Sequence, residues 1–242
     1  MPDAWPPRPP LAPVILVPGL VGSAITGRRT SGEPFGPLWC VGVEWSQLWL
    51  QPALLMPNAK DCLLRALELH YNASSGIYSN TSGVELDASV DWGGVNGVAY
   101  LSPDGPLSSF TGYFSALVDA LTARGYTPGL DLHGAPYDWR LAPDAHLTPG
   151  GYYGRLRLLI ETSVSRSGRR AWVVAHSLGC PTASAFFSRQ PDVWLRAHVK
   201  GFVALAGVWA GGASMVNIAP RNLHLLLIYM VNPIYTHIYL SN

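Results

Sequence analysis

A serine where a strand meets a helix is the residue of this chain best placed for covalent chemistry. Ser177 stands in the run Ala175-His176-Ser177-Leu178-Gly179, with small residues two positions to either side. Small residues there let the strand and the helix cross closely, so that the turn pushes the hydroxyl out of the sheet. The start of the helix also directs free backbone N–H groups toward an oxyanion. The pattern indicates a nucleophile; the alternative is a buried serine in a tight turn.

The segments on both sides of Ser177 favour the nucleophile. Residues 171–175 form a short apolar run rich in β-branched side chains, as is typical of a buried strand. The residues after the turn predict a helix with Ala183, Phe186 and Phe187 on its apolar face. Strand, serine and helix in this order form the nucleophile elbow of α/β-hydrolases, here with alanine at the first glycine of G-x-S-x-G.

The other apolar runs predict the sheet that holds this elbow. Expected strands cover residues 14–17, 67–71, 84–90, 130–132 and 199–205, and expected helices cover residues 112–124 and 152–164. Alternating strands and helices imply an α/β fold with a mostly parallel central sheet and right-handed crossovers. No repeat or low-complexity block interrupts the pattern, so we expect one domain that carries a small inserted sheet region.

Composition narrows the class of partner. The 242 residues are enough for one sizeable α/β core. The chain is 48% hydrophobic and 13% charged, about half the usual charged share. Its net charge of +1 gives no reason to expect a nucleic-acid partner. Nine tryptophans suit a protein that handles apolar ligands or lipid, but they suit the core of a large sheet protein equally well.

An apolar segment between two cysteines has two interpretations. Residues 40–62 begin and end with cysteine and hold a cluster of large apolar side chains, and three cysteines in all leave one unpaired in any intrachain scheme. The cluster comprises Trp45, Leu48, Trp49, Leu54, Leu55 and Met56. It is either ordinary core or a membrane-facing flap, and its concentration in one segment favours the flap.

Six stretches, in the same order, resemble the lecithin–cholesterol acyltransferase and lysosomal phospholipase A family. They are residues 14–19 (VILVPG), 40–62, 71–72 (YN), 134–140 (GAPYDWR), 175–180 (AHSLGC) and 206–212 (AGVWAGG). The GAPYDWR motif is the most distinctive of them. The resemblance implies an α/β-hydrolase core over residues 13–212, with a membrane-binding loop at 40–62 and an insertion at about 63–100.

The resemblance also implies particular roles for site residues. Ser177 would take an acyl chain from a phospholipid and pass it to a sterol, another lipid alcohol or water. Leu20 and Leu178 hold the positions of the two oxyanion N–H donors, although the family usually has aspartate where Leu20 stands. Cys40 and Cys62 would form the disulfide that closes the loop, which leaves Cys180 free. Within this loop, we expect Trp49, Leu54, Leu55 and Met56 to insert into a membrane or a lipid particle.

The acid and the base of a catalytic triad are not found. In α/β-hydrolases, aspartate and then histidine follow the serine, but no Asp or Glu occurs after Asp192. His224 and His237 lie in an atypical apolar tail, residues 213–242. A serine without a base is a weak nucleophile. We therefore expect an incomplete sequence; the alternative is a catalytically inactive lipid-binding relative.

The remaining polar residues of the motifs are expected to be structural. His176 should point away from Ser177, His133 should be structural, and Asp138 should pair with Arg140 or cap a turn. No metal or cofactor is expected.

The N-terminal segment and two sequons bear on the cellular location. The proline-rich residues 1–12 lack the features of a signal peptide. Sequons at Asn72 and Asn80 nevertheless fit a glycoprotein of the secretory pathway, either lysosomal, vacuolar or extracellular. The apolar stretch 223–240 contains Asn232, Pro233 and His237, which make a membrane anchor an unfavoured interpretation.

Overall fold

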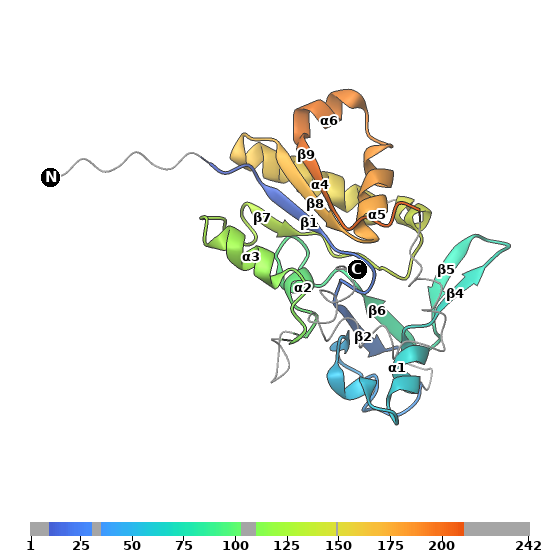
Figure 1. Cartoon of the computed structure of the whole chain (residues 1–242). Coiled ribbons are helices and arrows are strands. Elements are labelled where there is room, and N and C mark those ends of the chain that lie inside the picture. Colours follow the sequence, from blue (N-terminus) through green and yellow to red (C-terminus); the bar gives the residue numbers. More distant parts are fainter. Residues whose placement is uncertain (1–9, 31–34, 103–109, 149, 211–242) are drawn as a thin grey trace, which may run out of the picture.

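A four-stranded parallel sheet forms the centre of the protein (Figure 1). The structure, a computed structural model, describes residues 10–30, 35–102, 110–148 and 150–210, so the expected tail at 213–242 lies outside it. The strands lie in the order β7 (Leu132–Gly134), β1 (Val14–Val17), β8 (Ala171–His176) and β9 (Val199–Leu205). Every neighbouring pair is parallel. The predicted α/β fold with a parallel sheet is confirmed.

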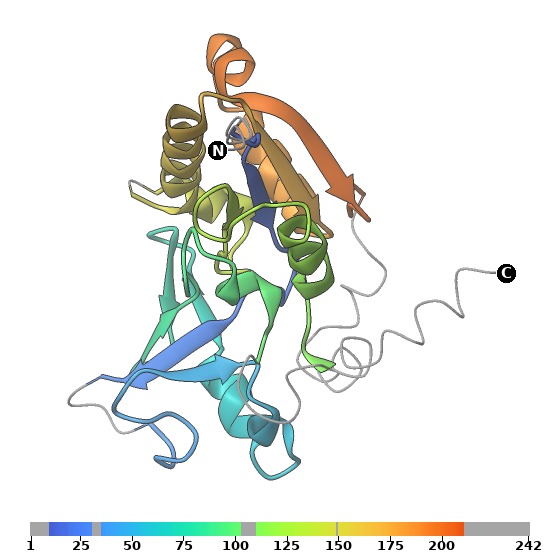
Figure 2. The ribbon, with the colours of Figure 1, turned by 90° about the vertical axis from the view of Figure 1, so that its left-hand side faces the viewer.

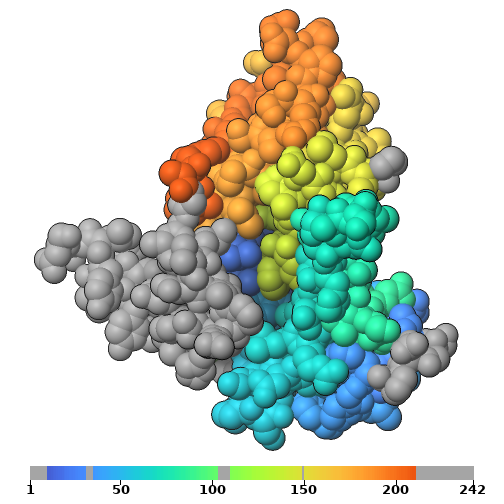
Figure 3. Space-filling model, turned by 90° about the vertical axis from the view of Figure 1, so that its right-hand side faces the viewer, coloured from blue at the N-terminus to red at the C-terminus, as the bar shows by residue number. Residues whose placement is uncertain are grey.

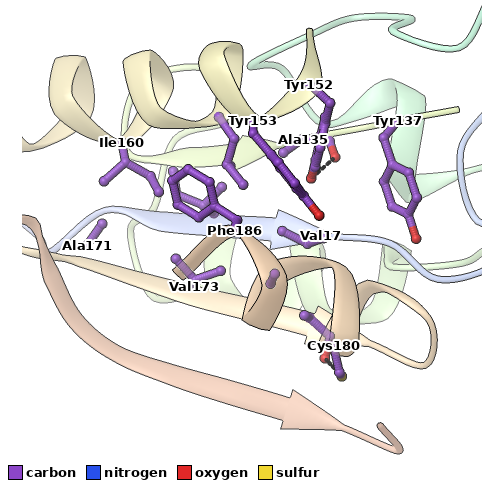
Figure 4. Packing of buried hydrophobic residues seen from close by; sticks show 14 of the residues in the cluster. Val17, Ala135, Tyr137, Tyr152, Tyr153, Ile160, Ala171, Val173, Cys180 and Phe186 are labelled. Carbon is purple, nitrogen blue, oxygen red and sulfur yellow. Dashed lines mark hydrogen bonds between the residues drawn. The ribbon is translucent and has the colours of Figure 1, made fainter. Parts of the chain in front are cut away.

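Helices cover both faces of this sheet (Figures 1 and 2). One face carries α4 (Tyr152–Ser167), α5 (Gly179–Phe187) and α6 (Asp192–His198), and the other carries α2 (Asn96–Ala99) and α3 (Ser115–Thr122). Alternate residues of a strand point to opposite faces. Ile15 and Val17 therefore pack with the first group of helices, and Val14 and Leu16 with the second. Figure 4 shows Phe186 of α5 with Ile160 and Tyr153 of α4 over the strands.

A second sheet is inserted after β1 and lies below the first in Figures 1 and 2. It is antiparallel, in the order β3 (Ser46–Trp49), β2 (Ile25–Arg29) and β6 (Val84–Asp87). The short helices η1 (Pro52–Leu55) and α1 (Lys60–Ala66) pack on it. Its strands span residues 25–87, so the inserted region starts well before the expected position near residue 63.

The disulfide closes part of the inserted body, which is our name for the described residues from 25 to 87. Cys40 and Cys62 are bonded, with Cα atoms 6.2 Å apart, and Cys180 is a free, buried thiol. Both parts of the expected cysteine pattern are confirmed. Within the described ranges, no helix is long and apolar enough to cross a membrane.

A hairpin of β4 (Leu69–Asn72) and β5 (Ile77–Asn80) lies against residues 138–148 (Figure 3). The buried Arg140 guanidinium joins the two parts. It donates to the Asp138 carboxylate at 2.6 and 2.9 Å, to the Leu67 carbonyl at 3.2 Å and to Asn80 Oδ1 at 2.9 Å. The predicted pairing of Asp138 with Arg140 is confirmed, and the pair fastens the hairpin to the core.

Candidate active site

Ser177 occupies a strained turn between β8 and α5. Its φ angle is 52°, in the left-handed region that non-glycine residues rarely adopt. The Ser177 N–H donates to the Leu205 carbonyl at 2.9 Å, which ties the turn to the end of β9. Backbone strain of this kind is concentrated at functional sites. The local geometry therefore agrees with the elbow that the sequence predicts.

Two glycines permit the close packing around this turn. A Cβ on Gly179 would collide with the carbonyl oxygens of Val17 and Pro18 at the end of β1. A Cβ on Gly19 would lie 2.8 Å from Ser177 Cβ and 2.9 Å from the His176 carbonyl oxygen. Such separations are too short for real carbon atoms, so only glycine fits at either position. The loop after β1 therefore lies directly against the serine.

This loop, residues 18–24, is the expected oxyanion loop and contains a tight turn. The Gly22 N–H donates to the Gly19 carbonyl at 3.1 Å, which places Leu20 and Val21 at the centre of a β-turn. Val21 has a φ angle of 55°, an unfavourable conformation for a β-branched residue. The assignment of the Leu20 and Leu178 N–H groups as oxyanion donors stays a prediction, supported by the contact of Gly19 with Ser177.

Side chains from distant segments hold the oxyanion loop. The Trp49 indole N–H donates to the Val21 carbonyl at 2.7 Å. The Trp139 indole N–H donates to the Ser23 carbonyl at 3.2 Å, and the two indoles meet edge to face at 5.5 Å. Sequence reasoning missed this role of Trp49, because the contact pairs residues 28 positions apart in the chain.

The expected membrane contact of Trp49 and Leu54 is wrong for this structure. Trp49 is 0% exposed, and Leu54 is also buried, because both side chains fill the core of the inserted body. Leu55 is partly buried, whereas Met56 is 58% exposed. Other apolar side chains nearby face outward instead: Leu38, Trp39, Val43 and Trp45, all in the loop of residues 36–45. We call residues 36–45 the apolar loop.

The described histidines do not serve Ser177. His176 Nδ1 lies 2.5 Å from the Tyr113 hydroxyl, and the buried His133 ring is bonded to the Gly93 and Leu130 carbonyls. No histidine of the described ranges is hydrogen-bonded to the Ser177 hydroxyl, and His224 and His237 lie outside those ranges. Nor does this part of the chain hold a cluster of three His, Cys, Asp or Glu side chains suited to a metal.

The two sequons occupy different surroundings. Asn72 is exposed at the hairpin turn, and its side-chain oxygen accepts from the Ser74 and Ser75 N–H groups at 2.9 and 3.2 Å. Asn80 is partly buried and its oxygen accepts from Arg140. Glycosylation of either asparagine stays a prediction.

Comparison with known proteins shows which family the chain is similar to. Residues 45–220 match the family described as "Lecithin:cholesterol acyltransferase". The chain is 33% identical over 207 residues to the human "Lysosomal phospholipase A and acyltransferase", a match that covers 85% of this chain and 49% of the relative. It is 32% identical over 200 residues to the human "Phosphatidylcholine-sterol acyltransferase", covering 82% of this chain and 44% of the relative. The chain spans about half the length of these curated relatives.

Proposed function

Because the chain belongs to the lecithin:cholesterol acyltransferase family, we propose that it is a lipid O-acyltransferase or phospholipase A that works through Ser177. The observation that carries the proposal is the strained Ser177 turn, φ 52°, packed against the loop at Gly19. A site of this form presents a hydroxyl nucleophile beside backbone N–H groups, as acyl transfer through an acyl-enzyme requires.

The proposed reaction has two steps. In the first, Ser177 Oγ attacks the carbonyl carbon of a phospholipid ester while a general base removes the hydroxyl proton. The carbonyl oxygen becomes an oxyanion that the Leu20 and Leu178 N–H groups would stabilise. When the resulting tetrahedral intermediate collapses, the C–O bond of the phospholipid ester breaks, and the lysophospholipid leaves with the proton from the base. In the second step, the hydroxyl oxygen of a sterol, of another lipid alcohol or of water attacks the acyl carbon of the acyl-serine. The bond from the acyl carbon to Ser177 Oγ breaks, the acceptor's proton passes through the base to Oγ, and the acyl chain leaves as an ester or a fatty acid.

Access to a lipid surface belongs to the same proposal. A phospholipid substrate is drawn from a membrane or a lipid particle, so the enzyme needs an apolar contact with that surface. The apolar loop offers Leu38 and Val43, each 65% exposed, together with Trp39 and Trp45. Tryptophan suits this role because its ring can enter the lipid while its N–H stays hydrated. We assign the membrane contact to this loop, with Met56, in place of Trp49 and Leu54.

A location in the secretory pathway fits the proposed function. One relative is named as lysosomal, and the Cys40–Cys62 disulfide is of a kind that persists in oxidising compartments. We extend the proposal to a lysosomal, vacuolar or extracellular protein.

A serine-directed probe tests the proposal. Wild-type protein should be labelled at Ser177 by a fluorophosphonate and should transfer an acyl chain from phosphatidylcholine vesicles to an alcohol or to water. Ser177→Ala should lose both properties. Ser188→Ala changes a serine at the far end of α5, outside the elbow, and should keep both. Absence of labelling in the wild type, or acyl transfer by Ser177→Ala, would reject the proposal.

A further inference from the structure

We infer that Tyr113 is a positioning residue of the site. Its hydroxyl joins the oxyanion loop, which packs against Ser177, to His176, which directly precedes Ser177 in the chain. The Gly19 N–H donates to Tyr113 Oη at 2.9 Å, and the same oxygen lies 2.5 Å from His176 Nδ1. The effect that we expect on reaction rates rests on the proposed acyl transfer at Ser177, whereas the role of Tyr113 in joining the loop to His176 does not.

Tyr113 reaches the site from an element that carries no other site residue. It lies just before α3, where its N–H donates to the Ala99 carbonyl at 2.8 Å. Its ring contacts the buried Phe114 ring edge to face at 4.9 Å and the His176 ring at 5.4 Å. A Cβ on Gly22 would lie 2.6 Å from the Tyr113 ring, so the ring lies flush against the oxyanion loop. The tyrosine is therefore fixed on several sides.

The direction of the hydrogen bonds follows from the donors present. Tyr113 Oη accepts the Gly19 N–H, and within the described residues the phenol proton has His176 Nδ1 as its one acceptor. Burial raises the pKa of Tyr113 and lowers the pKa of His176, which keeps the phenol protonated and the imidazole neutral. His176 Nδ1 thus accepts, and its proton resides on Nε2. The relay runs from Gly19 through Tyr113 to His176.

The relay fixes the loop where precision matters. Gly19 precedes Leu20, whose N–H is the proposed oxyanion donor, and Gly19 touches Ser177. An oxyanion donor works only when it is held at hydrogen-bond distance from the developing charge. The unfavourable φ angle of Val21 means that the turn needs support from outside itself. Tyr113 supplies this support at Gly19, and Trp49 supplies it at the Val21 carbonyl.

Tyr113→Phe removes only the hydroxyl and is the decisive variant. The matched control is Tyr126→Phe, because the partly buried Tyr126 also uses its hydroxyl for one backbone contact, donating to the Ala12 carbonyl at 3.1 Å near the other end of β1. Two readouts separate positioning from simple stability. Nitrogen NMR of the His176 ring reports its tautomer, and the rate of fluorophosphonate labelling of Ser177 reports the oxyanion site.

We expect Tyr113→Phe to abolish the single Nε2–H tautomer of His176 and to shift the Gly19 amide proton upfield. We also expect it to slow Ser177 labelling roughly tenfold, and to lower kcat on a short soluble ester with little change in KM, because an oxyanion donor acts mainly in the transition state. Tyr126→Phe should change none of these readouts.

Two results would overturn the inference: an unchanged His176 tautomer in Tyr113→Phe, or a changed tautomer with an unchanged labelling rate. If the wild type is not labelled at Ser177, the proposed function fails. The His176 tautomer and the Gly19 amide shift then decide together whether Tyr113 joins the loop to His176.

Discussion

Val21 and Ser177 adopt φ angles of 55° and 52° on two segments that touch at Gly19. Neither residue is glycine, so each conformation costs on the order of 1–3 kcal/mol and persists because surrounding contacts impose it. At Val21 the contact is the hydrogen bond from the buried Trp49 indole. At Ser177 it is the hydrogen bond from the serine N–H to the Leu205 carbonyl. The site is thus held by contacts made far from it in the sequence.

Trp49→Phe should weaken the support of the oxyanion loop. One aromatic ring is retained, but the nitrogen-bearing ring of the indole is lost and the Val21 carbonyl loses its partner. The unsatisfied carbonyl should lower the free energy of unfolding by about 1–3 kcal/mol, and the cavity left by the smaller side chain should lower it further. Ser177 labelling should slow. Trp194→Phe is the control, since the buried Trp194 donates to Glu161 at 2.7 Å away from the loop. It should lose stability without any change in labelling. Equal labelling rates for both variants would contradict this role of Trp49.

His146 should make stability depend on pH. Its ring is buried against Tyr137, Tyr152 and Tyr153, and within the described residues its Nε2 has no hydrogen-bond partner. Burial lowers the pKa of His146 from 6.5 to about 4, with a smaller opposing effect from Asp138. Because the pKa of His146 is lower in the folded than in the unfolded state, the neutral ring favours folding. This contribution to the free energy of unfolding is complete above pH 6.5 and is lost as the pH falls toward 4.

Urea unfolding at pH 7 and pH 4.5 measures this effect. Between these pH values, the wild type should lose about 2–3 kcal/mol more unfolding free energy than His146→Gln, which carries no titratable group at that position. Parallel losses in the two proteins would show that His146 is not the group responsible.

Among the elements, the inserted body relies on cross-links as well as on its core. Its three strands are only four or five residues long. The Cys40–Cys62 disulfide closes a segment that ends in the first turn of α1, and Arg140 ties the β4–β5 hairpin to the core. A small body of this kind buries a limited core and gains more from such links than a large sheet does. The disulfide therefore stabilises the inserted body from within, and Arg140 joins its hairpin to residues of the core.

The double substitution Cys40→Ser with Cys62→Ser should lower the free energy of unfolding by about 3 kcal/mol, because opening a loop of 22 residues restores chain entropy to the unfolded state. Chemical denaturation of both proteins, with and without reductant, gives the measurement. Reductant should destabilise the wild type and leave the double variant unchanged. A variant as stable as the oxidised wild type would contradict the expectation.

In the whole molecule, the oxyanion loop is also one of the connections between the parallel sheet and the inserted body. Residues 18–24 leave β1 of the parallel sheet and enter β2 of the inserted sheet. The inserted body carries the apolar loop, and the parallel sheet carries Ser177. The oxyanion loop, which forms part of the proposed site, therefore continues directly into the body that carries the proposed lipid contact. This arrangement favours a role of the inserted body in substrate access.

Leu38→Ala should weaken binding to phosphatidylcholine vesicles by roughly ten- to a hundredfold, since an apolar side chain gains about 1.5–3 kcal/mol on burial. Leu158→Ala is the control, because Leu158 is 63% exposed on α4, close to the 65% of Leu38, but lies outside the inserted body. Vesicle sedimentation measures the binding, and hydrolysis of a short soluble ester should be unchanged in both variants. Equal binding by the two variants would reject the apolar loop as the lipid contact.

Local sequence was sufficient for the parts of the protein that depend on short-range patterns. The strands at Val14–Val17 and Val199–Leu205 match their predicted bounds, and Ser177 lies at the predicted turn. Both strands are mainly apolar runs, although only Val14–Val17 is fully buried, whereas Val199–Leu205 lies at the edge of the described sheet. An elbow needs small residues at fixed spacing, so the strands and the elbow are both visible within ten residues. The cysteine pairing also followed, once the family motifs were recognised.

Only the tertiary structure decided which way the apolar side chains of the inserted body face. Trp49 and Trp45 belong to the same apolar segment, yet one is fully buried and the other is 42% exposed. Trp49 ends β3 and Trp45 directly precedes it. Their sheet pairs strands up to about sixty residues apart, and no local pattern encodes that pairing. The same holds for Tyr113, which lies 94 positions from Gly19 and 63 from His176. A hydrogen bond between such residues exists only after the chain has closed the intervening loops, because the sequence fixes which groups are present but the fold fixes which of them meet.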